Sequence, residues 1–134
     1  MPPFEFDIRV YYEDTDAQGV VYYANYLKYL ERARSEWLRR SGIPVSHLAT
    51  GQNLVFVVRR VEIDYMAAAK LDDVLSVTVE LSEISKVSFK LNQNILRQDQ
   101  LLTRATLKLA CLDATKFKPV RIPDKINKLI QTRH

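Results

Sequence analysis

The chain has 134 residues, 47% of them apolar and 27% charged, a composition typical of one folded domain spanning residues 1–134 rather than of a disordered or fibrous protein. No apolar run approaches the roughly 18 residues of a membrane-spanning helix, and no secretory signal is visible. The net charge of +4 arises in residues 113–134, which hold six Lys/Arg against two Asp. The single cysteine, Cys111, cannot form an internal disulfide, so we expect a cytoplasmic protein.

The N-terminal third of the chain reads as a strand, a polar turn and a long helix. Apolar and polar residues alternate over residues 4–12, from Phe4 to Tyr12, which predicts a half-buried strand. A polar, turn-rich stretch follows over 13–19. From 25 to 41 the apolar residues recur at the spacing of one helix face, and Gly42 is placed to end the helix. The residues on that face are Tyr26, Leu30, Ala33 and Trp37.

The rest of the chain predicts four strands and a short C-terminal helix. A loop over 43–53, with a short helical turn around His47, leads into the strands. The strands are expected at residues 54–66, 74–82, 87–96 and 101–112, with gaps of hairpin length between the last three. Pro123 and Asp124 are placed to open the terminal helix. This order predicts an α+β domain in which a five-stranded antiparallel sheet packs against one long helix. Its edge strands favour a homo-oligomer.

The chemistry-bearing segment is residues 11–34, where a carboxylate-rich turn leads through Gly19 into the helix. The first backbone N–H groups of a helix have no internal acceptors and carry partial positive charge, so they can stabilise an oxyanion. A carboxylate held beside them can act as general base or nucleophile. Asp14 and Asp16 are the candidates, although aspartates also commonly cap turns and helices. The pattern is compatible with acyl transfer that does not depend on histidine.

Several residues in this segment carry a resemblance to a known family. The run Tyr12-x-Asp14-Thr15-Asp16-x-x-Gly19-Val20-Val21-Tyr22-x-x-x-Tyr26-x-x-x-x-Glu31-Arg32-x-Arg34 resembles the signature of hotdog-fold acyl-CoA thioesterases of the 4-hydroxybenzoyl-CoA thioesterase type. The similarity is greatest to the group encoded beside the Tol–Pal cell-envelope genes of bacteria. It continues through residues 56–60, through Ala67-x-Ala69-x-Leu71-Asp72-Asp73, and to Lys116-x-Lys118-Pro119.

The resemblance implies a hotdog fold, in which a sheet wraps around a central helix, assembled into dimers and often tetramers. It implies hydrolysis of an acyl-CoA thioester to a carboxylate and free CoA. Asp16 matches the family's catalytic carboxylate, as nucleophile or general base. Tyr23, four residues after Gly19, matches the position whose backbone N–H polarises the thioester carbonyl. Many family members have histidine there, a change that leaves a backbone role intact.

Further residues are assigned by combining this resemblance with the chemistry of CoA. Its phosphates need cations, so we expect substrate contacts at Arg59, Lys86, Ser88 and Lys90, in addition to Gly19 and Val20. We expect no metal site, because the chain has only two histidines and one cysteine, and no other cofactor. The resemblance also suggests cell-envelope or lipid-synthesis proteins as partners.

Other residues in the motif and beyond it have structural interpretations. Asp14 is interpreted as a turn or interface residue, and Glu31 as the helix partner of Arg34 or Ser35. His47 is expected at the surface or in a packing role, and Cys111 in the core without reactivity.

Three alternative functions differ in how well the sequence fits them. A hotdog dehydratase is disfavoured because the helix over 25–41 contains no histidine. A nucleic-acid binder is disfavoured because the positive charge is confined to the C-terminal stretch and no aromatic-basic strand motif is present. A non-catalytic module that binds acyl-CoA or an envelope protein is compatible with every residue named.

Overall fold

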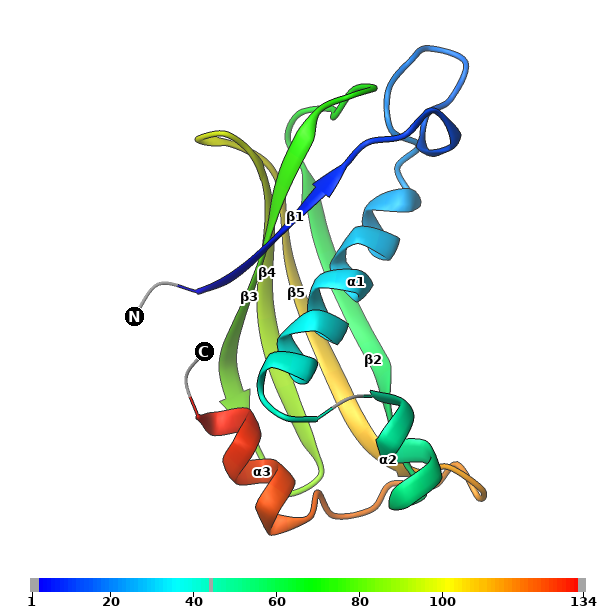
Figure 1. Ribbon diagram of the computed structural model, residues 1–134, viewed down its shortest axis with the longest axis vertical. Coiled ribbons are helices and arrows are strands. Elements are labelled where there is room, and N and C mark those ends of the chain that lie inside the picture. The colour runs from blue at the N-terminus through cyan, green and yellow to red at the C-terminus, as the bar shows by residue number, and fades with distance from the viewer. Residues whose placement is uncertain (1–2, 44, 133–134) are drawn as a thin grey trace.

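The computed structural model describes residues 3–43 and 45–132; Arg133 and His134 lie outside them. The elements in chain order are β1 (Phe4–Arg9), α1 (Asn25–Arg40), α2 (Val45–Gly51), β2 (Leu54–Tyr65), β3 (Val74–Ile84), β4 (Ser88–Arg97), β5 (Gln100–Asp113) and α3 (Asp124–Gln131). The strands form one antiparallel sheet in the order β1-β3-β4-β5-β2. The sheet curls around α1 (Figure 1), which confirms the expected α+β fold.

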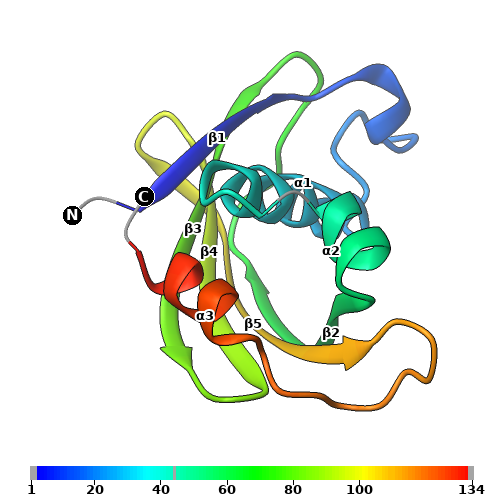
Figure 2. The same ribbon diagram turned by 60° about the horizontal axis from the view of Figure 1, so that its bottom comes forward.

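Helix α1 forms where its apolar residues repeat, and it buries the predicted face. Tyr26, Leu30, Ala33 and Trp37 are all buried against the concave side of the sheet. The Trp37 ring lies 6.3 Å from the ring of Phe89 on β4, measured between centroids. Burial of one large apolar side chain stabilises a fold by about 1.5–3 kcal/mol, so this face fixes the helix in the sheet. Figure 2 shows the strands curving around the helix.

The strand predicted over residues 4–12 is wrong at its C-terminal end. Strand β1 ends at Arg9, and a short 3-10 helix covers Tyr12–Asp14. Oδ2 of Asp14 accepts the backbone N–H of Tyr11 at 2.8 Å, which bends the chain away from the sheet. Tyr12 is consequently 82% exposed instead of lying on the buried face. The other predicted strands and the long helix match the observed ones to within two residues.

The end of the barrel-like sheet farthest from residues 13–19 is covered by the two short helices. The helical turn expected around His47 is α2, and the expected terminal helix is α3, which buries Ile126 and Ile130. The backbone N–H of Ile122 donates to the carbonyl of Lys86 at 2.7 Å, which fixes the segment before α3 to the β3–β4 hairpin. These contacts place α3 against the opposite end of the sheet from the start of α1 (Figure 1).

Strand β2 is a long edge strand. It pairs with β5 on one side, and no other strand of the described residues pairs with it. The register shifts between Val58 and Arg60, so Arg59 stands at an irregularity of the kind seen at sheet edges. Val58 and Val61 are exposed along this strand. An edge of this length with apolar residues is a template for pairing with another chain.

Candidate active site

Asp16 lies in a tight turn between two short antiparallel segments that precede α1. Its backbone N–H donates to the carbonyl of Val20 at 2.9 Å, and its carbonyl accepts the N–H of Gly19 at 3.0 Å. Gly19 has a φ of +80°, a conformation that favours glycine. Oδ1 of Asp16 accepts the N–H of Gln18 at 2.9 Å. Oδ2 accepts no hydrogen bond within the described part of the chain, so one carboxylate oxygen is held and the other is free to act.

Asp14 has a different role, because its side chain is buried, with only 6% of the residue exposed. Besides the bond from Tyr11, its backbone carbonyl accepts the N–H of Tyr22 at 3.1 Å and Nδ2 of Asn25 at 2.8 Å. Burial and the nearby Asp14 carboxylate both raise the pKa of Tyr29 well above its ordinary value. Asp14 therefore holds the turn against the first residues of α1, in agreement with its interpretation as a turn residue.

The start of α1 presents backbone N–H groups without internal acceptors. The backbone carbonyl of Tyr22 accepts the N–H of Asn25 at 2.8 Å, and the carbonyl of Tyr23 accepts the N–H of Tyr26 at 3.3 Å. Among residues 3–43 and 45–132, no acceptor is bonded to the backbone N–H of Tyr23 or of Ala24. These two groups lie at the positive end of a 16-residue helix. They are suited to donate hydrogen bonds to a carbonyl oxygen or an oxyanion.

A shallow cleft of about 280 Å³ adjoins the start of α1 and is lined mainly by aromatic and small side chains. The hydroxyl of Tyr65, the last residue of β2, donates to the carbonyl of Tyr23 at 3.2 Å. The Tyr65 ring packs edge-on at 5.4 Å from the Tyr26 ring and 6.2 Å from that of Tyr23. The lining residues are Val21, Tyr23, Tyr26, Tyr65, Met66, Ala67 and Ala68. Tyr65 and Met66 are not predictable from the motif, because they lie about 40 residues beyond it and no local pattern links them to it.

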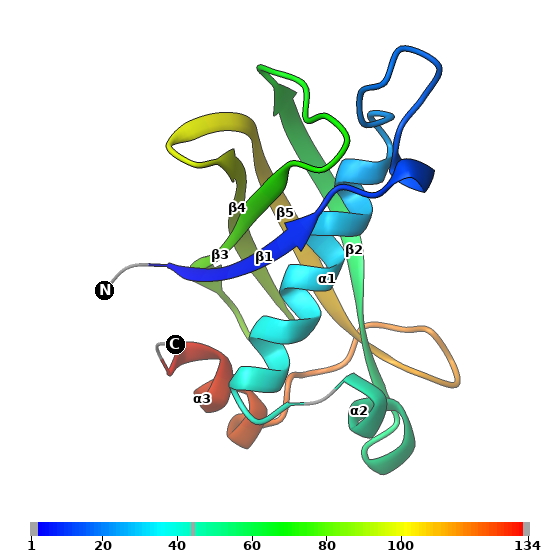
Figure 3. The same ribbon diagram turned by 45° about the horizontal axis from the view of Figure 1, so that its top comes forward.

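The residues expected to contact substrate fall into two groups, of which only one lies beside Asp16 within a single chain. Gly19 and Val20 lie in the Asp16 turn, and Arg59 lies midway along the edge strand β2. Lys86, Ser88 and Lys90 lie at or near the β3–β4 hairpin, at the opposite end of the sheet (Figures 1 and 3). Helix α1 alone spans about 24 Å between these two ends. Lys90 is engaged in an ion pair with Glu83 at 3.2 Å.

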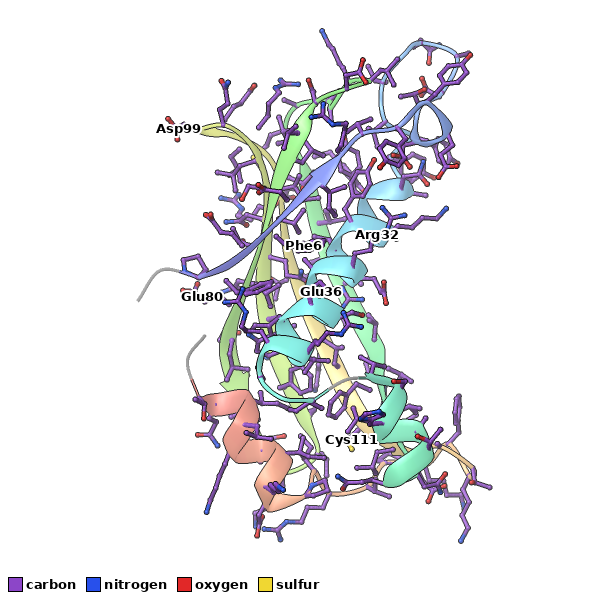
Figure 4. All side chains as sticks on the ribbon, viewed as in Figure 1. Phe6, Arg32, Glu36, Glu80, Asp99 and Cys111 are labelled. Atoms are coloured by element: carbon purple, nitrogen blue, oxygen red, sulfur yellow. The ribbon has the colours of Figure 1, made fainter. Side chains whose placement is uncertain are left out.

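The remaining candidates have structural roles. Ser35 donates to Glu31 at 3.0 Å, as expected for a helix pair. His47 is exposed, and Cys111 is buried (labelled in Figure 4), where burial raises the pKa of its thiol to about 11. The described residues contain no group of three or more His, Cys, Asp or Glu side chains placed to bind a metal ion. Across the same residues, no helix combines the length and apolar character needed to cross a membrane.

Comparison with known proteins assigns this fold to the hotdog class of thioesterases. Residues 10–130 match the family model of the Thioesterase-like superfamily, and the chain belongs to that family. It is 48% identical to the acyl-CoA thioesterase YbgC of Haemophilus influenzae, over 92% of this chain and 90% of that one. It is 40% identical to the acyl-CoA thioester hydrolase YbgC of Escherichia coli, over 92% of both chains.

A solved structure supports the same assignment. The probable thioesterase from Bartonella henselae superposes with a TM-score of 0.88 at 38% identity, over 91% of this chain and all of that one. The expected hotdog fold and the expected enzyme class, a thioester hydrolase, are thereby confirmed.

Proposed function

We propose that this chain hydrolyses acyl-CoA thioesters, with Asp16 as the catalytic carboxylate and the backbone N–H of Tyr23 as the group that polarises the thioester carbonyl. The observation that carries the proposal is that one short segment holds both required groups. One Asp16 carboxylate oxygen has no hydrogen-bond partner in the described chain, and the backbone N–H groups at the start of α1 have no acceptor there. The names of the YbgC relatives, which match over nine-tenths of this chain, support the same substrate class.

The chemistry can follow either of two routes. As general base, Asp16 takes a proton from water, and the hydroxide oxygen bonds to the thioester carbon. The carbonyl oxygen becomes an oxyanion that the Tyr23 N–H stabilises. The C–S bond then breaks, and the CoA sulfur takes the proton from Asp16. As nucleophile, Asp16 attacks the carbon itself, expels the thiolate and forms a mixed anhydride, which water hydrolyses to the carboxylic acid and restored Asp16.

The position of the expected CoA contacts supports a homo-oligomeric enzyme. Lys86, Ser88 and Lys90 lie far from Asp16 in one chain. The unpaired edge of β2 can pair with β2 of a second copy of the chain. Antiparallel pairing of two β2 strands reverses the second sheet, so that its hairpin end comes toward the Asp16 end of the first. We therefore propose a dimer, or a tetramer of two dimers, with a substrate cleft at the subunit contact. The residues that line this cleft are Arg59, Lys86, Ser88 and Lys90.

The cellular setting follows from the family resemblance alone. We propose a single-domain cytoplasmic enzyme whose gene lies beside the Tol–Pal genes and whose partners are cell-envelope or lipid-synthesis proteins. Co-purification of a tagged chain from its native cells tests the last point: recovery of such proteins is the expected result, and their absence under cross-linking contradicts it.

A thiol-release assay tests the central proposal. Purified protein is mixed with acyl-CoA substrates of increasing chain length and a thiol-reactive dye. Saturable CoA release that is proportional to enzyme concentration is expected for at least one of them. Binding of acyl-CoA without release across the series would instead identify a non-catalytic module.

A further inference from the structure

The loop over residues 66–73, between β2 and β3, contacts residues 16–26. These residues, from Asp16 to the first turn of α1, are called the catalytic segment below. The carbonyl of Ala69 accepts the backbone N–H of Val21 at 2.9 Å, and Val20 forms an isolated antiparallel bridge with Lys70. The N–H of Ala69 donates to the hydroxyl of Tyr26 at 2.9 Å. One buried residue, Ala69, therefore contacts the chain both between Asp16 and Tyr23 and inside the first turn of α1.

The same loop is fixed to the sheet by Arg97, the last residue of β4. Nη1 of Arg97 donates to Oδ2 of Asp73 at 2.7 Å and to the carbonyl of Ala68 at 3.2 Å. Nη2 donates to Gln100 at 2.7 Å across the β4–β5 hairpin, whose tip carries the labelled Asp99 in Figure 4. Oδ2 of Asp73 also accepts the N–H of Lys70 at 2.9 Å. Arg97 and Asp73 thus fix the loop at residues on both sides of Ala69.

This ion pair is better shielded from water than the others. The side chains of Arg97 and Asp73 are 27% and 22% exposed, whereas those of Arg39 and Glu36 on α1 are 58% and 36% exposed. Shielded pairs are screened less by salt and hold a defined geometry more firmly. The motif residues Ala69 and Asp73 have no part in the proposed chemistry, yet both lie in this connection to the catalytic segment.

We propose that Arg97 and Asp73 are positioning residues for thioester hydrolysis, which act through Ala69 to keep the Asp16 turn in register with the start of α1. The inference rests on the proposed function. Displacement of a catalytic group by about 1 Å can lower a rate by roughly 10²-fold, although substrate still binds. Loss of the pair is therefore expected to lower kcat much more than it alters KM.

The test compares variants of the full-length chain in the thiol-release assay. Arg97→Met and Asp73→Asn should each lower kcat, by about 10- to 100-fold for Arg97→Met, with KM changed less than about 3-fold. Because the two residues act through one connection, the kcat of the double variant should be little lower than that of Arg97→Met alone. Arg97→Lys, which keeps a cation beside Asp73, should recover most of the lost kcat. Glu36→Gln, which breaks the exposed helix pair labelled at Glu36 in Figure 4, is the matched control and should leave kcat unchanged.

Folding is checked for each variant by near-ultraviolet circular dichroism, and the milder Asp73→Asn and Arg97→Lys cover the case in which Arg97→Met does not fold. An unchanged kcat in folded Arg97→Met or Asp73→Asn overturns the inference while the proposed hydrolysis stands. An equal loss in Glu36→Gln, or no recovery in Arg97→Lys, assigns the pair a structural role only. A wild-type chain that releases no CoA overturns the proposed function and this inference with it.

Discussion

The hydroxyl of Tyr65 donates to the carbonyl of Tyr23 at 3.2 Å, which joins the last residue of the edge strand β2 to the peptide bond between Tyr23 and Ala24. The N–H of that peptide belongs to Ala24 and has no acceptor among the described residues. A hydrogen bond to a peptide carbonyl polarises the amide and strengthens its N–H as a donor. The edge strand therefore contributes to the electrostatics of the helix start.

The Ala24 N–H neighbours the Tyr23 N–H at the helix start and can donate to the same oxyanion. Replacement of Tyr65 by Phe weakens it and is expected to lower kcat by about 5-fold, the equivalent of about 1 kcal/mol. The fold should be unaffected, because the ring that packs against Tyr26 is kept. Tyr12→Phe removes a hydroxyl from an exposed tyrosine and serves as the control. Equal kinetics for the two variants would show that the Tyr65 hydroxyl plays no part in turnover.

Tyr23→Phe separates the backbone from the side chain at the position proposed to polarise the thioester carbonyl. If only the N–H of Tyr23 acts, removal of its exposed hydroxyl should reduce kcat/KM by less than about 3-fold. Steady-state kinetics on one acyl-CoA measure the effect. A loss of two or more orders of magnitude, over about 2.7 kcal/mol of barrier, would show that the hydroxyl itself participates.

The acid stability of the fold should depend on Asp73. Burial raises the pKa of Asp73, but the hydrogen bond from Arg97, the bond from the Lys70 N–H and the Arg97 charge outweigh it, so the pKa is below its ordinary value. The unfolded chain then binds more protons at acidic pH, and the contribution of Asp73, complete above its unfolded pKa of about 3.9, is lost as the pH falls through the folded pKa.

Chemical denaturation at a series of pH values from about 6 to about 3 measures this dependence. The free energy of unfolding should fall less steeply with decreasing pH in Asp73→Asn than in the wild type. Some dependence should remain, because the backbone N–H groups of Lys116 and Thr115 also lower the pKa of Asp113. Identical slopes for wild type and Asp73→Asn would contradict the assigned ion pair.

Much of this fold is predictable from local patterns, and the exceptions have identifiable causes. Helix α1 follows from its spacing because one continuous face is buried by the sheet. The end of β1 is not predictable in this way, because the alternation of apolar and polar residues continues to Tyr12. The Asp14 carboxylate, which accepts the N–H of Tyr11, turns the backbone away before that point. The Arg97–Asp73 contact joins residues 24 apart through the β3–β4 pairing, so no local pattern indicates it. The position of Asp14 and Asp16 before the helix makes both of them candidates, and the family signature selects Asp16 and adds Tyr23 as predictions.

The oligomeric state is a further prediction. The free edge of β2 and its exposed Val58 and Val61 should pair with a second chain, so light scattering should give a multiple of 15.6 kDa. Val61→Lys places a charge on that edge and should shift the mass toward the monomer and lower activity on dilution. Val74→Lys, an equally exposed valine on β3, should leave the mass unchanged. A fully active wild-type monomer at assay concentration would contradict a cleft formed by two chains.

The most direct measurement is kcat/KM for Asp16→Asn beside Asp14→Asn, each confirmed as folded. Asparagine keeps the turn hydrogen bond from Gln18 at position 16 but cannot accept a proton or attack the thioester, so Asp16→Asn should lose at least about 10³-fold. Asp14→Asn weakens a buried charged hydrogen bond and should chiefly lower thermal stability, with a much smaller kinetic loss. Near wild-type turnover in Asp16→Asn together with an inactive but folded Asp14→Asn would reverse the assignment of the catalytic carboxylate.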